Sequence, residues 1–289
     1  MSKQTLLAYY QLTRLNRPIG IYLVLWPALW GLWLAADGIP PLDILIVFIL
    51  GAIVMRSAGC VINDYADRHF DGHVSRTCAR PLATGQLSEK QALGFFLILA
   101  LFGFGLVLTL NTLTVWMSLG AVALAILYPF MKRYTYWPQV FLGAAFAWAI
   151  PMAFTAVQNQ LPWQAWVVFA VTLVWALIYD TAYAVADKAD DLKLGIKSTA
   201  ILFGKKLPWL VGFFQLVMLS GLVWIGQLFD LGTFYYASLI AVLGLFGYHQ
   251  TLLSKQDPEL AFKAFLNNHW VGLVVLIGIM VDQASRSLL

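Results

Sequence analysis

Nine long apolar runs are the feature that most restricts how this 289-residue chain can fold. They cover residues 18–36, 42–63, 91–110, 112–131, 138–157, 163–186, 208–228, 233–252 and 265–284. About 20 apolar residues are enough to cross a bilayer as a helix, and in lipid a spanning backbone must satisfy its own hydrogen bonds. With 61% hydrophobic and only 11% charged residues, the composition excludes an ordinary soluble domain. We therefore predict an all-α polytopic membrane protein with nine transmembrane helices around a central cavity, forming a single domain over 1–289.

The positive charges predict the orientation of these helices. If the N-terminus is cytoplasmic, all but two of the 18 Lys and Arg residues fall on the cytoplasmic side. The exceptions are Arg56, inside the second run, and Arg286, in the C-terminal tail. Positive residues concentrate on the cytoplasmic side of membrane proteins. The net charge of +4 therefore indicates topology and contact with anionic membrane lipid, and no nucleic-acid-binding arm. No cleavable signal peptide is expected either.

Half of the 14 acidic residues lie in two stretches, 63–71 and 180–191, and each stretch closes an apolar run. Four predicted spans separate the two stretches, so both return to the same face of the membrane. Asn63, Asp67 and Asp71 are spaced i, i+4 and i+8, and Asp187 and Asp191 are spaced i and i+4. Each set therefore projects from one side of a helix. Because carboxylates at such positions are costly, the pattern indicates a functional site, and two facing sets of this kind would clamp a divalent cation.

The chemistry of the two acidic sets favours Mg²⁺ and a diphosphate. Mg²⁺ in proteins is held by one or two carboxylates and completes its shell with water and phosphate oxygens. We predict a metal site formed by Asn63, Asp67, Asp71, Asp187 and Asp191, with the four aspartates catalytic. Basic residues on the same face, which would grip the diphosphate, are Arg68, Arg76, Arg80 and Lys197. A substrate with a diphosphate head and a long apolar tail would place its tail between the helices.

A further basic segment ends the fourth run and contains Tyr128, Lys132 and Arg133. One interpretation is an ordinary positive anchor at the membrane surface. The other is a binding site for an anionic second substrate. Arg56 lies about 10 Å deeper in the membrane than Asn63, at 1.5 Å per helical residue, and requires a carboxylate, carbonyl groups or water as partner.

Aromatic residues make up 15% of the chain, and most are expected in interfacial belts and core packing. Some lie close to the acidic stretches, where their ring faces would stabilise a carbocation. These candidates are Tyr65, Tyr128, Tyr179 and Tyr183.

The motifs above resemble those of the UbiA-type intramembrane aromatic prenyltransferases, most closely the branch that acts on 4-hydroxybenzoate. The matching segments are 14–20, 56–67, 76–82, 128–135, 179–184 and 195–200, and the resemblance extends nearly end to end. The family's NxxxDxxxD motif falls on Asn63, Asp67 and Asp71, and its DxxxD motif falls on Asp187 and Asp191.

The resemblance implies a nine-helix bundle, Mg²⁺, a polyprenyl diphosphate donor and an aromatic acid acceptor. The prenyl group would be transferred to the ring carbon ortho to the hydroxyl of 4-hydroxybenzoate, an early step of ubiquinone biosynthesis in the bacterial cytoplasmic (inner) membrane. It also implies that Arg133 receives the carboxylate of the acceptor.

Three alternatives stay open at this level. A related enzyme with dihydroxynaphthoate, homogentisate or haem as acceptor would differ around 128–135. An acid-lined cation transporter is disfavoured because the acids gather at one mouth and Arg56 lies deep. A phosphotransferase acting on lipid headgroups would require a DxxxD motif soon after Asp71-Gly72, and none follows before residue 187.

We predict that cysteine labelling from the two sides of the membrane places 72–90 and 192–206 on the cytoplasmic side and 37–43 outside. The lopsided distribution of Lys and Arg is the reason. Labelling of the two acidic loops from opposite sides would refute both the number of spans and the shared site.

Overall fold

The structure is a computed structural model that describes residues 3–72 and 77–286. Within these ranges the chain is helical and contains no strand. The helices are α1 (Lys3–Leu12), α2 (Ile19–Ala36), α3 (Leu42–Asp71), α4 (Glu89–Val107), α5 (Thr112–Tyr134), α6 (Pro138–Ala147), α7 (Ala149–Gln158), α8 (Trp163–Leu194), α9 (Thr199–Phe203), the 3₁₀ turn η1 (Gly204–Lys206), α10 (Leu207–Leu228), α11 (Thr233–Leu253), α12 (Pro258–Asn267) and α13 (His269–Arg286).

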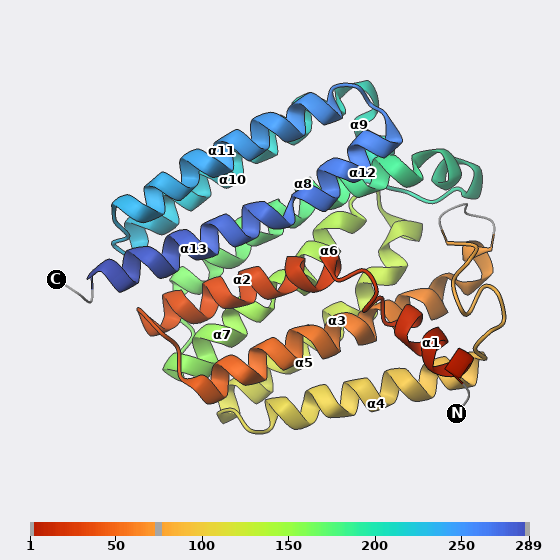
Figure 1. Cartoon of the computed structure of the whole chain (residues 1–289), viewed down its shortest axis with the longest axis horizontal. Helices are drawn as coiled ribbons and strands as arrows, with labels where there is room; N and C mark the ends of the chain where they lie inside the picture. The colour runs from red at the N-terminus through yellow and green to blue at the C-terminus, as the bar shows by residue number, and fades with distance from the viewer. Residues whose placement is uncertain (1–2, 73–76, 287–289) are drawn as a thin grey trace.

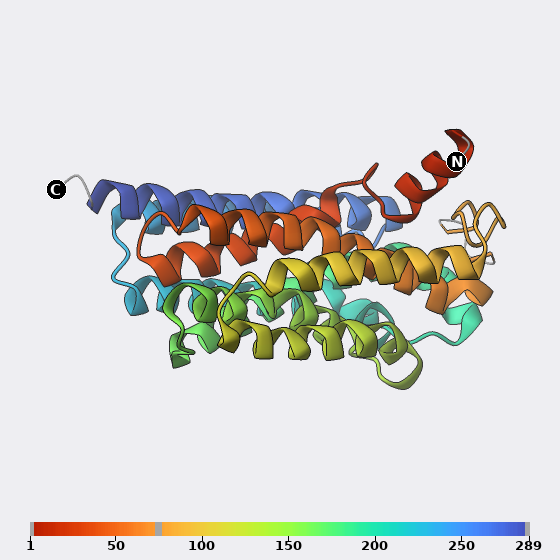
Figure 2. The same ribbon diagram turned by 90° about the horizontal axis from the view of Figure 1, so that it is seen from below.

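The long helices lie side by side along the longest axis of the molecule (Figure 1). Seen after a quarter turn, α1 projects from one end of the bundle (Figure 2). In the described part of the chain, 9 helical segments are long and apolar enough to cross a membrane. The predicted all-α architecture of nine spans is thus confirmed, and the chain is a multi-pass membrane protein.

Two helices are longer than the apolar runs predicted. Helix α3 continues past residue 63 to Asp71, and α8 continues past residue 186 to Leu194. At 1.5 Å per residue they are about 45 and 48 Å long, whereas the hydrocarbon layer is about 30 Å thick. The apolar runs therefore underestimate both helices, because a helix that leaves the hydrocarbon need not end there. Both acidic motifs lie on these protruding helical ends.

Two spans consist of two helices each, and a local cause is visible at both breaks. Helices α6 and α7 meet at Trp148, where Pro151 lacks the N–H that would bond the carbonyl of Ala147. Helices α12 and α13 meet at Asn268, whose side chain donates to the carbonyl of Ala264 at 2.8 Å. Such a bond competes with the regular backbone ladder.

The core of the bundle is built on aromatic rings and small residues. Trp30 of α2 stacks on Trp175 of α8 with ring centroids 5.4 Å apart, and its indole N–H donates to the carbonyl of Gly272 at 2.9 Å. A Cβ at Gly272 would overlap the ring of Trp175, so only glycine lets α13 approach this closely. Helices α2, α8 and α13 are thereby fixed around the interior, with α3 and α7 packed against α2 and with α6, α10 and α12 packed against α8.

Candidate active site

A cavity of about 470 Å³ lies between α2, α3, α5, α6, α8 and α12. Most of the residues that the sequence predicted as functional line it. They are Asn63, Asp67, Asp71, Arg80, Tyr128, Lys132, Asp187, Asp191 and Lys197. The two acidic helix faces, which are far apart in sequence, therefore share one cavity, as their spacing and topology predicted.

Three predicted residues have a different place. Arg68 and Arg133 line a separate pocket formed by α3, α4 and α5. Arg133 donates to the backbone carbonyl of Ala66 at 2.9 Å, and Arg68 forms an ion pair with Glu89 at 3.1 Å. Arg76 falls outside the described residues. Neither Arg68 nor Arg133 lies in the cavity. The substrate-binding roles predicted for the three arginines stay predictions.

Lys132 connects α5 to the first acidic motif. Its ammonium group pairs with Oδ2 of Asp67, a carboxylate that is only 4% exposed. In the described part of the chain, no hydrogen-bond donor reaches the buried Oδ1 of Asp67. One oxygen of this carboxylate thus pairs with Lys132, while the other has no hydrogen-bond donor in the described part of the chain.

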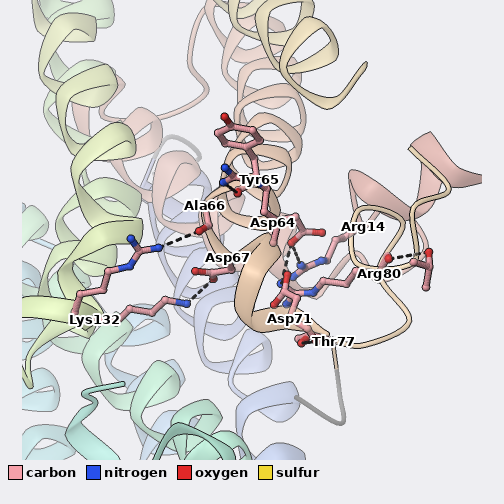
Figure 3. Close-up of polar contacts among 12 residues, drawn as sticks. Arg14, Asp64, Tyr65, Ala66, Asp67, Asp71, Thr77, Arg80 and Lys132 are labelled. Atoms are coloured by element: carbon pink, nitrogen blue, oxygen red, sulfur yellow. Dashed lines mark hydrogen bonds and ion pairs between the residues drawn. The ribbon is translucent and has the colours of Figure 1, made fainter. Parts of the chain in front are cut away.

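A second ion-pair cluster joins the N-terminal segment to the end of α3 (Figure 3). Oδ1 of Asp64 accepts from Arg14 and lies 3.0 Å from Nη1 of Arg80. The same Nη1 donates to Oδ2 of Asp71 at 2.8 Å. Asp64 is 1% exposed and does not line the cavity, whereas both arginines do. It therefore acts as a buried anchor that holds two cations at the wall of the cavity.

The local backbone explains how these groups meet. Helix α1 ends in a turn in which Arg14 adopts a left-handed conformation, with φ 58°, so that its side chain turns back towards α3. After α3, the hydroxyl of Thr77 donates to the carbonyl of Asp71 at 2.8 Å and draws the following segment, with Arg80, back onto the helix end. Burial raises the pKa of the Asp71 carboxyl to about 6, and the charge of Arg80 opposes part of that rise.

The donor set fits Mg²⁺ better than a transition metal. The groups that face the cavity are carboxylates and an amide, which are hard oxygen ligands, and the buried Oδ1 of Asp67 has an unused lone pair. Within the described ranges, no three His, Cys, Asp or Glu side chains converge closely enough to form a complete metal site by themselves. An ion at this place would thus depend on ligands from both helices and on oxygens from a bound anion.

Two charged residues, Asp180 and Arg56, lie in the deeper wall of the cavity, and the sequence had assigned no role to either. Asp180 and Arg56 both line the cavity. Each precedes its acidic motif by seven residues, two helical turns, so a common face was readable from the spacing. The guanidinium of Arg56 donates to Cys60 and lies 5.9 Å from the ring centroid of Phe146.

Two further observations define the surroundings of Arg56. Its buried Nε has no hydrogen-bond partner in the part of the chain that the structure describes. A Cβ at Gly20 would overlap its guanidinium, so the glycine leaves the space that this side chain occupies. Arg56, which lines the cavity, is therefore held in place by tight packing against α2.

Aromatic side chains complete the wall between the acidic mouth and the deep end. Those that line the cavity are Tyr128, Phe146, Tyr179, Tyr183, Phe262 and Phe265. Tyr183 and Phe265 meet edge to face, with centroids 4.9 Å apart. Tyr65, also proposed from the sequence, lines the separate pocket with Arg68 and is the exception. The cavity thus combines carboxylates and cations at its mouth with ring faces deeper inside, an arrangement suited to ionising an anionic leaving group and stabilising a carbocation.

Fold and site together define an intramembrane prenyltransferase. The chain belongs to the UbiA prenyltransferase family, whose model matches residues 24–272. It is similar, at 74% identity over 97% of this chain and 98% of the relative, to 4-hydroxybenzoate octaprenyltransferase of Hydrogenovibrio crunogenus. It is also 55% identical to the protein of the same name from Saccharophagus degradans, over 97% of this chain and 94% of the relative.

Solved structures share the fold. The apo structure of a UbiA homolog from Aeropyrum pernix K1 matches with a TM-score of 0.81 at 22% identity, covering 91% of this chain and 97% of the other. A UbiA homolog from Archaeoglobus fulgidus bound to GPP and Mg²⁺ matches with a TM-score of 0.72 at 16% identity, covering 95% of this chain and 99% of the other.

We predict that Asp64→Asn lowers the free energy of unfolding by roughly 2–3 kcal/mol. Removing one member of a fully buried ion pair costs about 3–5 kcal/mol, and partial exposure of Arg14 and Arg80 reduces that cost here. Lys193→Gln is the matched control, because it breaks the exposed pair with Asp190 and should change stability by less than about 1 kcal/mol. Thermal unfolding in detergent measures both, and equal effects of the two variants would contradict the anchoring role.

Proposed function

We propose that this prenyltransferase transfers a polyprenyl group from polyprenyl diphosphate to the ring carbon ortho to the hydroxyl of 4-hydroxybenzoate, with Mg²⁺, in ubiquinone biosynthesis. The observation that carries the proposal is the meeting of both acidic helix faces with Lys132 and Arg80 around one cavity. The names of the 74% and 55% identical relatives support the acceptor and donor classes. The Archaeoglobus homolog bound to GPP and Mg²⁺ supports the ligands. The predicted placement is the bacterial cytoplasmic membrane, with the N-terminus and the mouth of the cavity cytoplasmic.

At the mouth, the carboxylates of Asp67, Asp71, Asp187 and Asp191 would hold the metal, with Asn63 as a further ligand. Bound Mg²⁺ would neutralise the charge that grows on the diphosphate as its bond to C1 of the prenyl chain breaks. Lys132 and Arg80 hold oxygens of Asp67 and Asp71. If those carboxylates held the metal, the two cations would be free to bind the diphosphate. Lys197 lines the same wall.

Deeper in the cavity, the ring faces of Tyr128, Tyr179 and Tyr183 would stabilise the allylic cation and keep water from it. The phenol ring of the acceptor attacks C1, a carbon–carbon bond replaces the carbon–oxygen bond, and the ring carbon loses its proton. The groups available to take that proton are the carboxylates of the cavity, the released diphosphate and water.

The carboxylate of the acceptor requires a cation. The resemblance assigns this role to Arg133, which lines the separate pocket, whereas Arg56 lines the cavity. We propose Arg56, because a planar acid that presents its ring to C1 must lie inside the cavity. A guanidinium grips a carboxylate with two parallel hydrogen bonds, so a lysine would be a poor substitute.

Incubation of membranes that contain the protein with labelled polyprenyl diphosphate, Mg²⁺ and a panel of aromatic acids tests the overall proposal. We expect a carbon-prenylated 4-hydroxybenzoate by mass analysis. A product formed only with dihydroxynaphthoate, homogentisate or haem would move the chain to another branch of the family. Absence of any prenylated product would overturn the proposed reaction.

We predict that Asp67→Ala, Asp71→Ala, Asp187→Ala and Asp191→Ala each remove most of the activity, because ligands that act as one unit respond non-additively. EDTA should have the same effect on the unmodified protein, and added Mg²⁺ should reverse it. The Asp37→Ala variant, at the opposite end of the bundle, is the control. Full turnover in chelator, or unmodified rates for Asp67→Ala, would refute the shared metal site.

We predict that Arg56→Ala raises the KM for 4-hydroxybenzoate by roughly 10- to 150-fold, the equivalent of one charged hydrogen bond at about 1.5–3 kcal/mol. The KM for the prenyl diphosphate should change much less, and Arg56→Lys should not restore binding. Arg133→Ala is the matched comparison and should leave the KM for the acid nearly unchanged. The opposite ranking of the two variants would return the acceptor site to Arg133.

A further inference from the structure

The separate pocket between α3, α4 and α5 is open to the side of the bundle. It has a volume of about 630 Å³. Only 11% of the membrane span on α4 and 17% of the span on α5 is buried inside the protein, so both helices lie at the outside of the bundle. We call this pocket the lateral groove; its apolar walls are Ile62, Phe96, Ile126 and Phe130.

The end of the lateral groove is basic. Arg68 and Arg133, near the C-terminal ends of α3 and α5, both line it, and its described lining contains no carboxylate. Both arginines are fixed by protein contacts at the groove wall. Arg133 donates to the carbonyl of Ala66 and lies 5.6 Å from the ring of Phe130, while Arg68 donates to the carbonyl of Tyr65 at 2.7 Å and lies 4.3 Å from its ring.

The contacts of Arg68 leave some of its donors for another anion. A guanidinium has five N–H donors. Arg68 uses them on one backbone carbonyl and on Glu89, an exposed carboxylate at the start of α4 that neutralises only part of the local charge. The side chain of Arg133 is exposed at the groove. Two oriented guanidinium groups at the membrane surface, above an apolar channel, match a phosphate head with an acyl chain.

We propose that the lateral groove is a binding site for one anionic phospholipid, with its phosphate on Arg68 and Arg133 and an acyl chain along Ile62, Phe96 and Ile126. The side chains of Ile126 and Phe130 are 55% and 39% exposed, so they offer the acyl chain of the lipid an apolar surface that is open to the bilayer. Charge complementarity favours phosphatidylglycerol, whose head is anionic, over phosphatidylcholine, whose head carries no net charge.

Native mass spectrometry of the full-length protein in mild detergent, with equal amounts of phosphatidylglycerol and phosphatidylcholine added, tests this site. We expect one phosphatidylglycerol retained in preference to phosphatidylcholine. Each arginine near a membrane surface favours an anionic lipid about fivefold, so Arg68→Gln/Arg133→Gln should lower the preference by about 25-fold. Lys205→Gln/Lys206→Gln, which removes two exposed charges at the same end, is the matched control and should lower the preference much less, because these charges lie outside the groove.

A second variant tests the groove separately from its charges. Ile126→Trp would fill the apolar channel while it leaves both arginines in place, and should lower retention of phosphatidylglycerol. Unfolding temperatures within a few degrees of the unmodified protein show that each variant is folded.

Several results would overturn the proposal. Equal retention of the two lipids, or an equal loss in the arginine and lysine pairs, would show that no specific anionic site exists. If the arginine pair instead loses retention of farnesyl diphosphate, the groove binds the prenyl donor. If it raises the KM for 4-hydroxybenzoate, the groove belongs to the acceptor.

Discussion

Compensation of buried carboxylates is the constraint on which this structure depends. An ionised carboxylate at the end of a membrane helix is stable only beside a cation, a hydrogen-bond donor or a metal. Asp64, Asp67 and Asp71 are each at most 5% exposed, and their cations come from three separate segments: Arg14 before α2, Arg80 after α3 and Lys132 on α5. The ion pairs that compensate the buried carboxylates therefore also hold together the segments that form the mouth of the cavity.

The same ion pairs would allow the carboxylates to exchange their protein cations for a metal ion. Lys132 and Arg80 occupy oxygens of the carboxylates that a divalent ion would need. A metal held by these carboxylates would compete with the two cations, and a bound diphosphate would offer the displaced cations new partners. Metal and diphosphate would then bind more tightly together than apart, a coupling that follows from charge alone. Asp64 lies behind this exchange, because it holds both arginines without lining the cavity.

Helices α3 and α8 are long enough to contribute residues to both the deep end and the acidic mouth of the cavity. Because both helices continue beyond the hydrocarbon layer, each presents one charged position deep in the cavity and its acidic motif near the membrane surface. Arg56 and Asp180 are about 10 Å from the motifs, at 1.5 Å per residue. In the proposed reaction, the diphosphate head of one substrate would thus meet the acids at one end while the carboxylate of the smaller substrate would reach Arg56 at the other.

The sequence by itself determined the class of fold, the nine spans and the pairing of the two acidic motifs, because hydrophobic length and helical periodicity are local properties. It also placed Lys132, Arg80 and Tyr128 near the motifs. It did not determine where α3 and α8 end, since nothing in an apolar run marks the point at which a helix outside the membrane stops. Only the tertiary structure decided that Asp64 is an anchor, that Arg56 faces the cavity and that Arg133 faces the lateral groove, because neighbouring residues on one helix, such as Lys132 and Arg133, point about 100° apart and the packing of other helices decides what each one meets.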